Sequence, residues 1–416
     1  MAAHTTLVTD EAIERLRQRI GVPERSRRQP FNEFATIDTI RHYAHGFGDD
    51  NPLWCDPAYA ASSVWGENIA PPMFAISSGV PEPVTWSDQE REAMSGGDPL
   101  RGVGQYLRAE RWHFAGPVRL GTRLTKRRAL VKAELTDPSA FAGGHRGAVV
   151  CWRVVYSDDA APETPLVVNE REFFYTERDA SPDANRRREL ASYDEAAIAE
   201  IDAAYERESR RGSQTRTSGD VSVGEELETI VRGPLTVTDV MAHHVGTGLG
   251  GQYGVGALRL AYANRQQVRG FYTLNPQGVP DVVQRCHWED AWANELGHPA
   301  AYDYGMMRMT WMSNLVTNWM GDGALMTSFE GSARKFNYLG DTQWLSGTVT
   351  EIAETSEGSM AHLTMEGTNQ LGQVTCRATA TVLLPSDSTA RVESATIEPS
   401  LASFDRDALV SAGETA

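Results

Sequence analysis

The stretch GDDNPLWCDPAYAASSVWGENIAPPMF, residues 48–74, places acids, a carboxamide, a short helical run and a proline pair close together. The residues before it recur at helical spacing and end at glycines, so this stretch is expected to begin as a loop just past a helix terminus. Within it, 57–64 predicts a short helix, and a further helix is expected to begin at Pro71 or Pro72, where a missing N–H costs little. The loop offers carboxylates and the Asn51 amide but no histidine, and the large ring of Trp54 stands among them. The stretch therefore holds about half of an acid–base site.

Length and composition indicate two globular units in a reducing compartment. The 416 residues exceed one ordinary core, which predicts two domains or a duplication. The net charge of -17 argues against nucleic acid as the main partner, because phosphate binding needs a basic surface. The four cysteines are scattered, with no CxxC pair and no metal-ligand spacing, so we expect free thiols and no metal site. The N-terminus lacks the apolar run of a signal peptide and no segment approaches the ~18 apolar residues of a membrane span, so we expect a cytoplasmic protein without a membrane partner.

An internal repeat predicts the architecture. The matched pairs are TIRHYAHGFG (39–48) with DVMAHHVGTG (239–248), WCDPAYAASSVWG (54–66) with HWEDAWANELG (287–297), and AGPVRLGTRLTKRRALV (115–131) with KFNYLGDTQWLSGTV (335–349). Each copy reads as a helix, an acidic loop, a further helix and a run of strands, which is typical of an α+β unit.

Four segments follow from this pattern. Residues 1–177 form the first domain, which carries the degenerate motif, and residues 219–385 form the second. Residues 178–218 are charged and poor in large apolar side chains, so they are expected to be a partly helical linker. Residues 386–416 are rich in Ser, Thr, Ala and acids, and we expect a flexible tail.

The motifs resemble those of a known family. The first half resembles the MaoC-like acyl dehydratases and (R)-specific enoyl-CoA hydratases in the order of its motifs, which is GDDNP, D-x2-YA, WG, IAPPMF and F-x2-PV-x2-G-T. The second half resembles the second domain of tandem members in HWEDAWANELGHPAAYDYGMMRMTW and FNYLGDTQW. The resemblance covers about residues 30–175 and 225–385. It implies an α+β double hot-dog fold, with two antiparallel sheets each wrapped round a central helix.

The resemblance also implies a reaction. Family hydratases interconvert a 2-enoyl thioester and its 3-hydroxyacyl form, carried on coenzyme A or an acyl-carrier protein, with no further cofactor. In the family an Asp and a His five residues later share a water that an Asn orients; Asp49 and Asn51 match the Asp and the Asn, but the His position is Trp54, which cannot exchange a proton. The family glycine whose N–H binds the thioester oxygen falls at Pro72, and proline has no N–H.

The second half shows the opposite pattern. His287 aligns with Trp54 and Gly305 with the missing glycine, while the Asp is absent and a glycine-rich insertion separates the parts. We therefore expect His287 to be the general acid/base and the Gly305 N–H to bind the thioester oxygen. Asp281 or Asp303 is then its carboxylate partner.

A second version pairs Asp49 with His287 across the interface between the lobes. In both versions the N-terminal lobe shapes an acyl tunnel, and Trp54, Asp303 and Tyr304 are expected to contact the substrate.

Simpler readings stay open at each position. Asp49 and Asn51 are also typical turn caps. The histidines His42, His45, His243 and His244 are assigned to a helix face or the core. Two basic clusters, Arg119 with Arg123, Lys126, Arg127 and Arg128, and Arg186 to Arg188, suit either the phosphates of coenzyme A or a solvated surface.

The rival functions are a thioesterase, a repurposed lyase or cyclase on the same fold, or a non-catalytic subunit that binds the acyl thioester. The expected partners are a small-molecule acyl thioester and a second copy of the chain, as a homodimer, or another hot-dog subunit.

Overall fold

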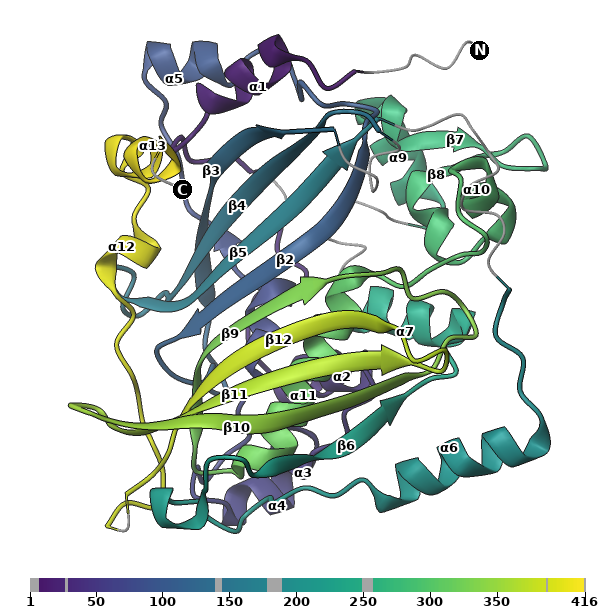
Figure 1. The fold of residues 1–416 in the computed structure, drawn as a ribbon. Coiled ribbons are helices and arrows are strands. Elements are labelled where there is room, and N and C mark those ends of the chain that lie inside the picture. Colours follow the sequence, from purple (N-terminus) through teal and green to yellow (C-terminus); the bar gives the residue numbers. More distant parts are fainter. Residues whose placement is uncertain are drawn as a thin grey trace.

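A computed structural model describes residues 7–26, 29–138, 144–177, 189–248, 257–386 and 388–414. Ten strands form one sheet in the order β1-β3-β4-β5-β2-β9-β12-β11-β10-β6, and β7 pairs with β8 beside it (Figure 1). The strands are β1 Val80–Pro81, β2 Gly104–Phe114, β3 Leu124–Thr136, β4 Gly147–Asp158, β5 Pro165–Thr176, β6 Glu226–Arg232, β7 Tyr272–Leu274, β8 Pro280–Val282, β9 Leu325–Ala333, β10 Gln343–Thr355, β11 Gly358–Asn369 and β12 Val374–Leu383.

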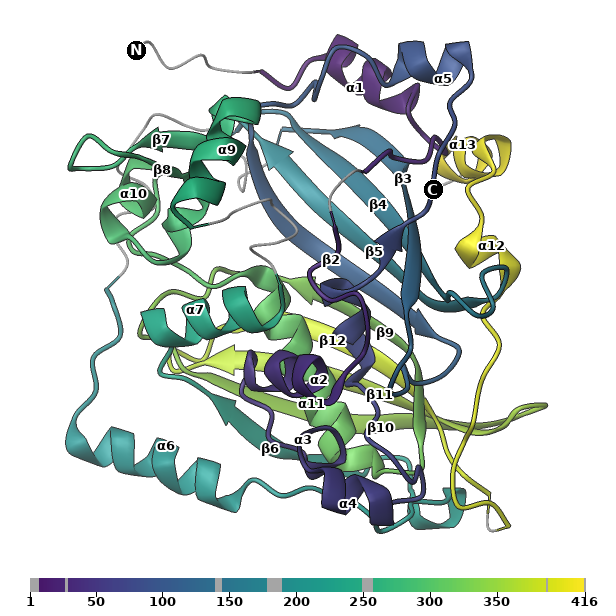
Figure 2. The same ribbon diagram turned by 180° about the vertical axis from the view of Figure 1, so that it is seen from behind.

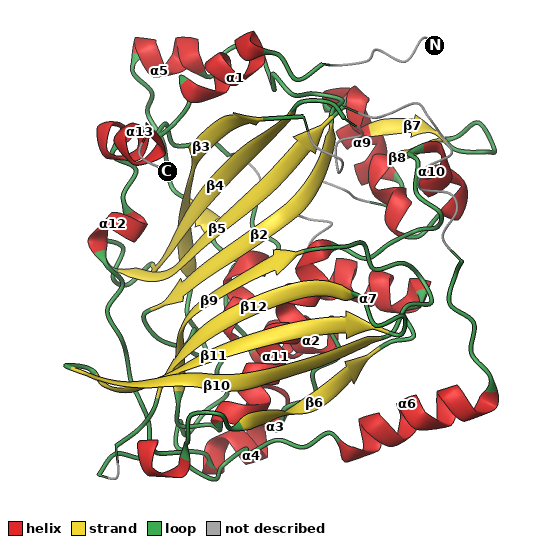
Figure 3. Ribbon diagram, in the orientation of Figure 1, coloured by secondary structure: helices red, strands yellow, loops and turns green. Residues whose placement is uncertain are grey.

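Helices lie on the concave face of the sheet and around its edges (Figure 3). The α-helices are α1 Asp10–Arg17, α2 Ile37–His45, α3 Pro52–Cys55, α4 Pro57–Ser62, α5 Asp88–Ala93, α6 Glu195–Arg207, α7 Val237–Gly246, α9 Arg259–Gln267, α10 Asp290–Glu295, α11 Gly305–Met320, α12 Pro399–Ala402 and α13 Arg406–Glu414. Short 3-10 helices are η1 Pro72–Ser77, η3 Ser218–Asp220, η4 Arg269–Phe271 and η5 Val283–His287. The short helix expected over 57–64 is present as α4. No described helix is long and apolar enough to cross a membrane.

The two lobes are joined edge to edge. Strand β2 of the first half pairs antiparallel with β9 of the second, with Arg111 opposite Glu330 and Trp112 opposite Phe329. Two edge strands that pair satisfy each other's backbone groups and bury what would otherwise be open edges. The predicted double hot-dog fold is thus confirmed, with its two sheets continuous as one.

The second lobe wraps its sheet around α11. Every residue of this helix after Gly305 is buried, and Gly321 ends it with a φ of 75°. A helix that is apolar on all sides belongs in a core. Its buried polar members, such as Thr310 and Thr317, bond back to carbonyls of the preceding turn.

The first lobe lacks such a helix. The expected helix from Pro71 is only the 3-10 turn η1, because Ser77 Oγ donates to the Phe74 carbonyl and Gly79 turns the chain with a φ of 94°. Figure 2 shows α11 and α2 in front of the second half of the sheet, and no comparable helix of the described residues in front of β3 and β4. The description of two equal sheets each wrapped round a helix therefore holds in full for the second lobe alone.

Helices α2 and α7 cross at a pair of glycines. They are the repeated segments of the sequence, and they meet at Gly46 and Gly246. A Cβ on Gly246 would lie 2.5 Å from the His42 carbonyl oxygen and 2.7 Å from the Gly46 Cα, so only glycine permits this approach. The crossing brings the C-terminal ends of the two repeated helices together.

The segment after the second domain runs along both lobes. Val392 N donates to the Gly323 carbonyl, Ala395 N donates to the Ala115 carbonyl, and Arg391 lies over the ring of Trp65. The stretch expected to be a flexible tail is therefore in contact with the body of the protein over its described residues.

Substituting Gly246 by alanine should destabilise the fold. The added Cβ meets backbone atoms that cannot move aside, so we expect a loss of about 1–3 kcal/mol despite the better helix propensity of alanine. Urea unfolding measures this. The matched control is Gly219→Ala, whose Cβ would find its nearest neighbour at 3.8 Å. Equal midpoints for the two variants would contradict the proposed tight crossing.

Candidate functional site

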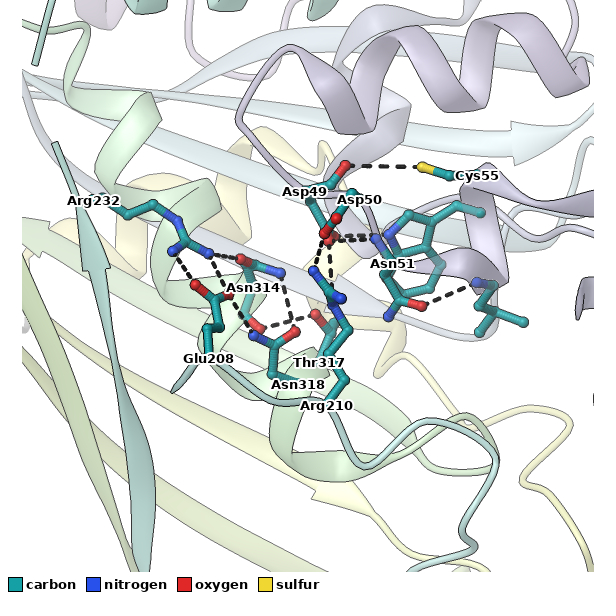
Figure 4. A network of polar contacts seen from close by, with 12 residues as sticks. Asp49, Asp50, Asn51, Cys55, Glu208, Arg210, Arg232, Asn314, Thr317 and Asn318 are labelled. Carbon is teal, nitrogen blue, oxygen red and sulfur yellow. Dashed lines mark hydrogen bonds and ion pairs between the residues drawn. The ribbon is translucent and has the colours of Figure 1, made fainter. Parts of the chain in front are cut away.

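The acidic loop of the first lobe is closed on itself. Gly48 turns the chain after α2 with a φ of 82°, and the Asp49 carboxylate that follows is only 1% exposed. Its Oδ1 accepts from the Asn51 backbone N–H at 2.9 Å, and its Oδ2 accepts from the Trp54 indole N–H at 2.8 Å (Figure 4). Trp54 thus occupies the place of a histidine as the partner of the acid, but it only donates.

Neighbouring hydrogen-bond donors favour the charged form of Asp49. Burial raises the pKa of Asp49, while Trp54, the Asn51 N–H and the nearby Arg210, 4.0 Å away, act to lower it. Asn51 in turn accepts from the Leu53 N–H and caps α3. Asp49 and Asn51 therefore both stabilise this loop by accepting hydrogen bonds from backbone N–H groups, as capping residues do.

A polar network separates this loop from the outer strand β6. Arg232 forms an ion pair with Glu208 at 2.7 Å and also donates to the Asn314 side chain, while Asn318 donates to Glu208 (Figure 4). Burial would raise the pKa of Glu208, but Arg232 and Asn318 outweigh it and lower that pKa. Buried charges need such complete pairing.

An open pocket lies beside the same loop. Its volume is about 530 Å³, counted with the open space at its mouth. Apolar side chains dominate its wall, and Asn51, Thr317 and Asp322 add polar atoms; the apolar lining includes Trp54, Trp65, Ile69, Phe114, Val118, Met320, Leu325 and Met326. Asp49 is not part of the lining. The pocket can therefore hold an apolar group, but its own motif supplies no proton carrier.

One buried carboxyl does reach this pocket. Asp322 follows the end of α11, and its Oδ2 accepts from the Tyr59 hydroxyl at 2.7 Å. Burial raises the pKa of Asp322, and the bond from Tyr59 acts against this. The two side chains tie the first lobe to the second at the wall of the pocket. Sequence reasoning missed both, because nothing in their spacing marks them as neighbours.

The histidine of the second lobe lies at the other end of α11. His287 ends η5, and its Nδ1 lies 2.9 Å from the Tyr302 carbonyl oxygen, so Nδ1 carries the proton in this bond. Its ring lies against the Tyr304 ring, with 3.8 Å between centroids. Burial acts to lower the pKa of His287, but Cys286, the Tyr302 carbonyl and Asp303 outweigh it and raise that pKa. An imidazole can both hold and release a proton, and these contacts favour its protonated form.

A second histidine joins this group. His244 on α7 has its Nδ1 2.9 Å from the Tyr304 hydroxyl, and Tyr304 directly precedes Gly305, the first residue of α11. His287, Tyr304 and His244 thus gather at the N-terminus of the longest helix, where the helix dipole favours negative charge. Sequence analysis assigned His244 to a helix face or the core, and it does lie on α7; its contact with Tyr304 could not be read from the sequence.

The two candidate carboxylates differ in position. Asp281 lies on β8 and accepts from the Val282 N–H, with no bond to His287. Asp303 pairs with Arg308 at 2.8 Å and accepts from Asn337, and burial raises its pKa to about 6. Asp303 acts on His287 through charge alone, since the hydrogen-bond partner of Nδ1 is the Tyr302 carbonyl.

The structure does not bring Asp49 and His287 together. Asp49 lies with the network beside Asn314 (Figure 4). His287 lies beside Tyr304. Nine residues of helix separate Gly305 from Asn314, roughly 14 Å along the axis. A shared water between the two side chains does not fit that separation.

The repeated motifs therefore have different surroundings. The pocket opens at the first motif, next to Trp54 and Pro72. At the second motif the corresponding region is filled by a cluster of rings, namely Tyr302, Tyr304, Phe336, Tyr338 and His298. The histidines therefore lie at the second motif, whereas the pocket opens at the first motif and has the Asp322 carboxyl in its wall.

Other expected ligands find little support in the described residues. The strand arginines Arg119, Arg123 and Arg128 are engaged with acidic side chains. The cluster Arg186 to Arg188 lies outside the described residues. No group of three or more His, Cys, Asp or Glu side chains in the described ranges is placed to hold a metal ion.

Comparison with known proteins agrees with the fold. Residues 28–145 match the family model of a FAS1-like dehydratase domain region. A solved MaoC-like dehydratase aligns with a TM-score of 0.58 at 15% identity, over 89% of this chain and 100% of that one. A conserved hypothetical protein from Mycobacterium tuberculosis with a double hot-dog fold aligns with a TM-score of 0.48 at 12% identity, over 86% of this chain and 96% of that one. No curated protein matches the sequence significantly.

Removing the indole N–H of Trp54 should expose the dependence of the loop on its bond with Asp49. We expect Trp54→Phe to cost about 1–3 kcal/mol at pH 7, because a buried carboxylate loses a donor. The measurement is a double-mutant cycle with Asp49→Asn by urea unfolding. A parallel cycle with Trp86→Phe, whose indole bonds to the Pro23 carbonyl, should be additive. Additive losses in the Trp54 cycle would argue against the bond.

Proposed function

The chain has the double hot-dog fold of the MaoC-like dehydratases, and we propose that it catalyses the reversible hydration or dehydration of an acyl thioester. The observation that carries the proposal is the group of His287, His244 and Tyr304 at the N-terminus of α11. In this reaction the thioester oxygen gains negative charge, and a helix N-terminus with an N–H such as that of Gly305 favours it. The carrier is coenzyme A or an acyl-carrier protein, and no other cofactor is required.

His287 is the proposed general acid/base. Its Nδ1 is fixed by the Tyr302 carbonyl, which leaves Nε2 to exchange the proton. The raised pKa of His287 favours the protonated ring, which is the form that donates a proton to C2 of the enoyl form. Tyr304 and His244 form the polar wall beside it.

The pocket of the first lobe is the proposed site for the apolar end of the acyl chain. Its wall of aromatic and aliphatic side chains fits an acyl group. Binding an apolar chain needs no proton transfer, so the absence of a histidine from this motif does not prevent it. A silent binding subunit is the second candidate function, favoured by the closed Asp49–Trp54 pair. Pairing with a second copy or with another hot-dog subunit is a further proposal.

Replacing His287 by asparagine should lower kcat for hydration of crotonyl-CoA by about 10²–10⁴-fold, because a positioned proton carrier is lost. Loss of the enoyl absorbance measures turnover, and His45→Asn, in an exposed position on α2, is the matched control.

Asp49→Asn should change kcat by less than about tenfold, since this carboxylate is engaged by Trp54. Full activity in His287→Asn would overturn the assignment. Release of free thiol instead of hydration would indicate a thioesterase, and neither product would indicate a silent subunit.

Filling the pocket should change chain selectivity. Ala70 is buried in the lining, so Ala70→Leu should lower kcat/KM for a long or branched enoyl-CoA by about tenfold and leave crotonyl-CoA nearly unaffected. Ala58→Leu, exposed on α4, is the control. An equal effect of Ala70→Leu on short and long substrates would place the acyl chain elsewhere.

A further inference from the structure

A second, smaller cavity lies on the seam between the lobes. It is lined from both halves, by Tyr43, Met73, Ile76, Glu110 and Trp112 of the first and by His243, Thr247, Met306 and Thr310 of the second. Tyr43 and His243 hold equivalent positions in the repeated helices α2 and α7, which cross beside it. The cavity therefore lies where the duplicated halves face each other.

Polar atoms in this cavity lack hydrogen bonds. His243 is 1% exposed and Tyr43 is fully buried, yet neither ring nitrogen of His243 nor the Tyr43 hydroxyl has a hydrogen-bond partner among the described residues. A neutral imidazole offers one donor and one acceptor, and burying both unpaired is costly. A cavity with several polar groups in its wall is the kind of site that holds ordered water.

The carboxyl of Glu110 faces the same cavity. It is 1% exposed, and its Oε1 lies 3.1 Å from the Arg171 Nε. Burial raises the pKa of Glu110 to about 7, against the effects of Arg171 and Trp112. Burial also lowers the pKa of His243 to about 3, so this ring stays neutral. The titratable groups that face Glu110 from the surrounding elements are Tyr43 on α2, Tyr156 on β4, Arg171 on β5 and His243 on α7.

The cavity adjoins the proposed catalytic group. Met306, in its wall, directly follows Gly305, and the His243 ring lies 6.0 Å from the Tyr304 ring, between centroids. Hydration of an enoyl thioester needs a base for the water and an acid for C2, yet Asp49, Asp281 and Asp303 are each bonded elsewhere. A carboxyl next to the helix N-terminus would supply the second group.

We propose that the seam cavity is a hydrated acid–base centre, in which water bound among Tyr43, Glu110 and His243 exchanges a proton with Glu110. The exchange is a proton transfer alone: the Glu110 O–H bond breaks as a water O–H bond forms, and the reverse step restores it. Glu110 is then a positioning and proton-storing residue of the first lobe that acts on the second through water. This role rests on the proposed function, whereas the hydrated centre itself does not.

The test uses Glu110→Gln in the full chain, with Glu172→Gln as the control, since Glu172 is a buried carboxyl on β5 outside the cavity. In the pH profile of kcat/KM for crotonyl-CoA, Glu110→Gln should lose an inflection near pH 7 that the wild type and Glu172→Gln keep. Tyr43→Phe, which removes only the hydroxyl, should shift that inflection. An unchanged profile in Glu110→Gln, with an active wild type, would overturn the role in catalysis.

Two readouts do not depend on activity. A high-resolution crystal structure should show water within hydrogen-bond distance of His243 and Glu110, and a dry cavity would overturn the proposal. Between pH 4.5 and about 7 the unfolded chain has released the Glu110 proton while the folded chain retains it, so the contribution of Glu110 to wild-type stability should fall with rising pH. The urea midpoint of Glu110→Gln should lack this fall, and parallel pH dependences would also overturn the proposal. If the wild type shows no hydration at all, the proposed function fails and these two readouts still decide whether the hydrated centre exists.

Discussion

The antiparallel pairing of β2 with β9 is the interaction on which the rest of the structure depends. Each strand is the edge of its own half, and pairing them satisfies the backbone groups of both. The Arg111 side chain reaches Glu330 directly across this junction. Because the two sheets become one, the helices of both halves must share a single concave face.

That shared face explains the unequal lobes. The long buried helix α11 occupies most of it, whereas at the matching place in the first half the described chain forms only the short turn η1. The end of α11 meets the first motif at the pocket, and its beginning meets the second motif at His287 and Tyr304. A single helix thus links a binding cavity at one end with proton-carrying groups at the other.

The buried polar groups fall into two sets, which differ in how many hydrogen-bond or ion-pair partners each group has. Asp49 accepts hydrogen bonds at both of its oxygens, and Glu208 is paired with Arg232 and Asn318, which gives them a structural role. His243 and Tyr43 have no such partners, and Glu110 has only Arg171 and the nearby Trp112 to favour its charged form. Incompletely paired groups gathered in one cavity are the feature that separates a functional candidate from a cap or a buried ion pair.

The sequence by itself determined the duplicated α+β architecture, since repeated helix, loop and strand patterns and the motif resemblance all lie in the order of residues. It also determined that the Trp54 indole cannot exchange a proton and that Pro72 has no backbone N–H to donate in a hydrogen bond. Both follow from the covalent structure of the residue alone. It did not determine the continuous sheet, the short η1 turn, the bond of Trp54 with Asp49, or the meeting of Glu110 with His243. The continuous sheet and the meeting of Glu110 with His243 join residues more than a hundred positions apart, so only the packing of the two halves sets their distances and burial. The η1 turn and the Asp49–Trp54 bond are local, and their geometry depends on how each short segment folds.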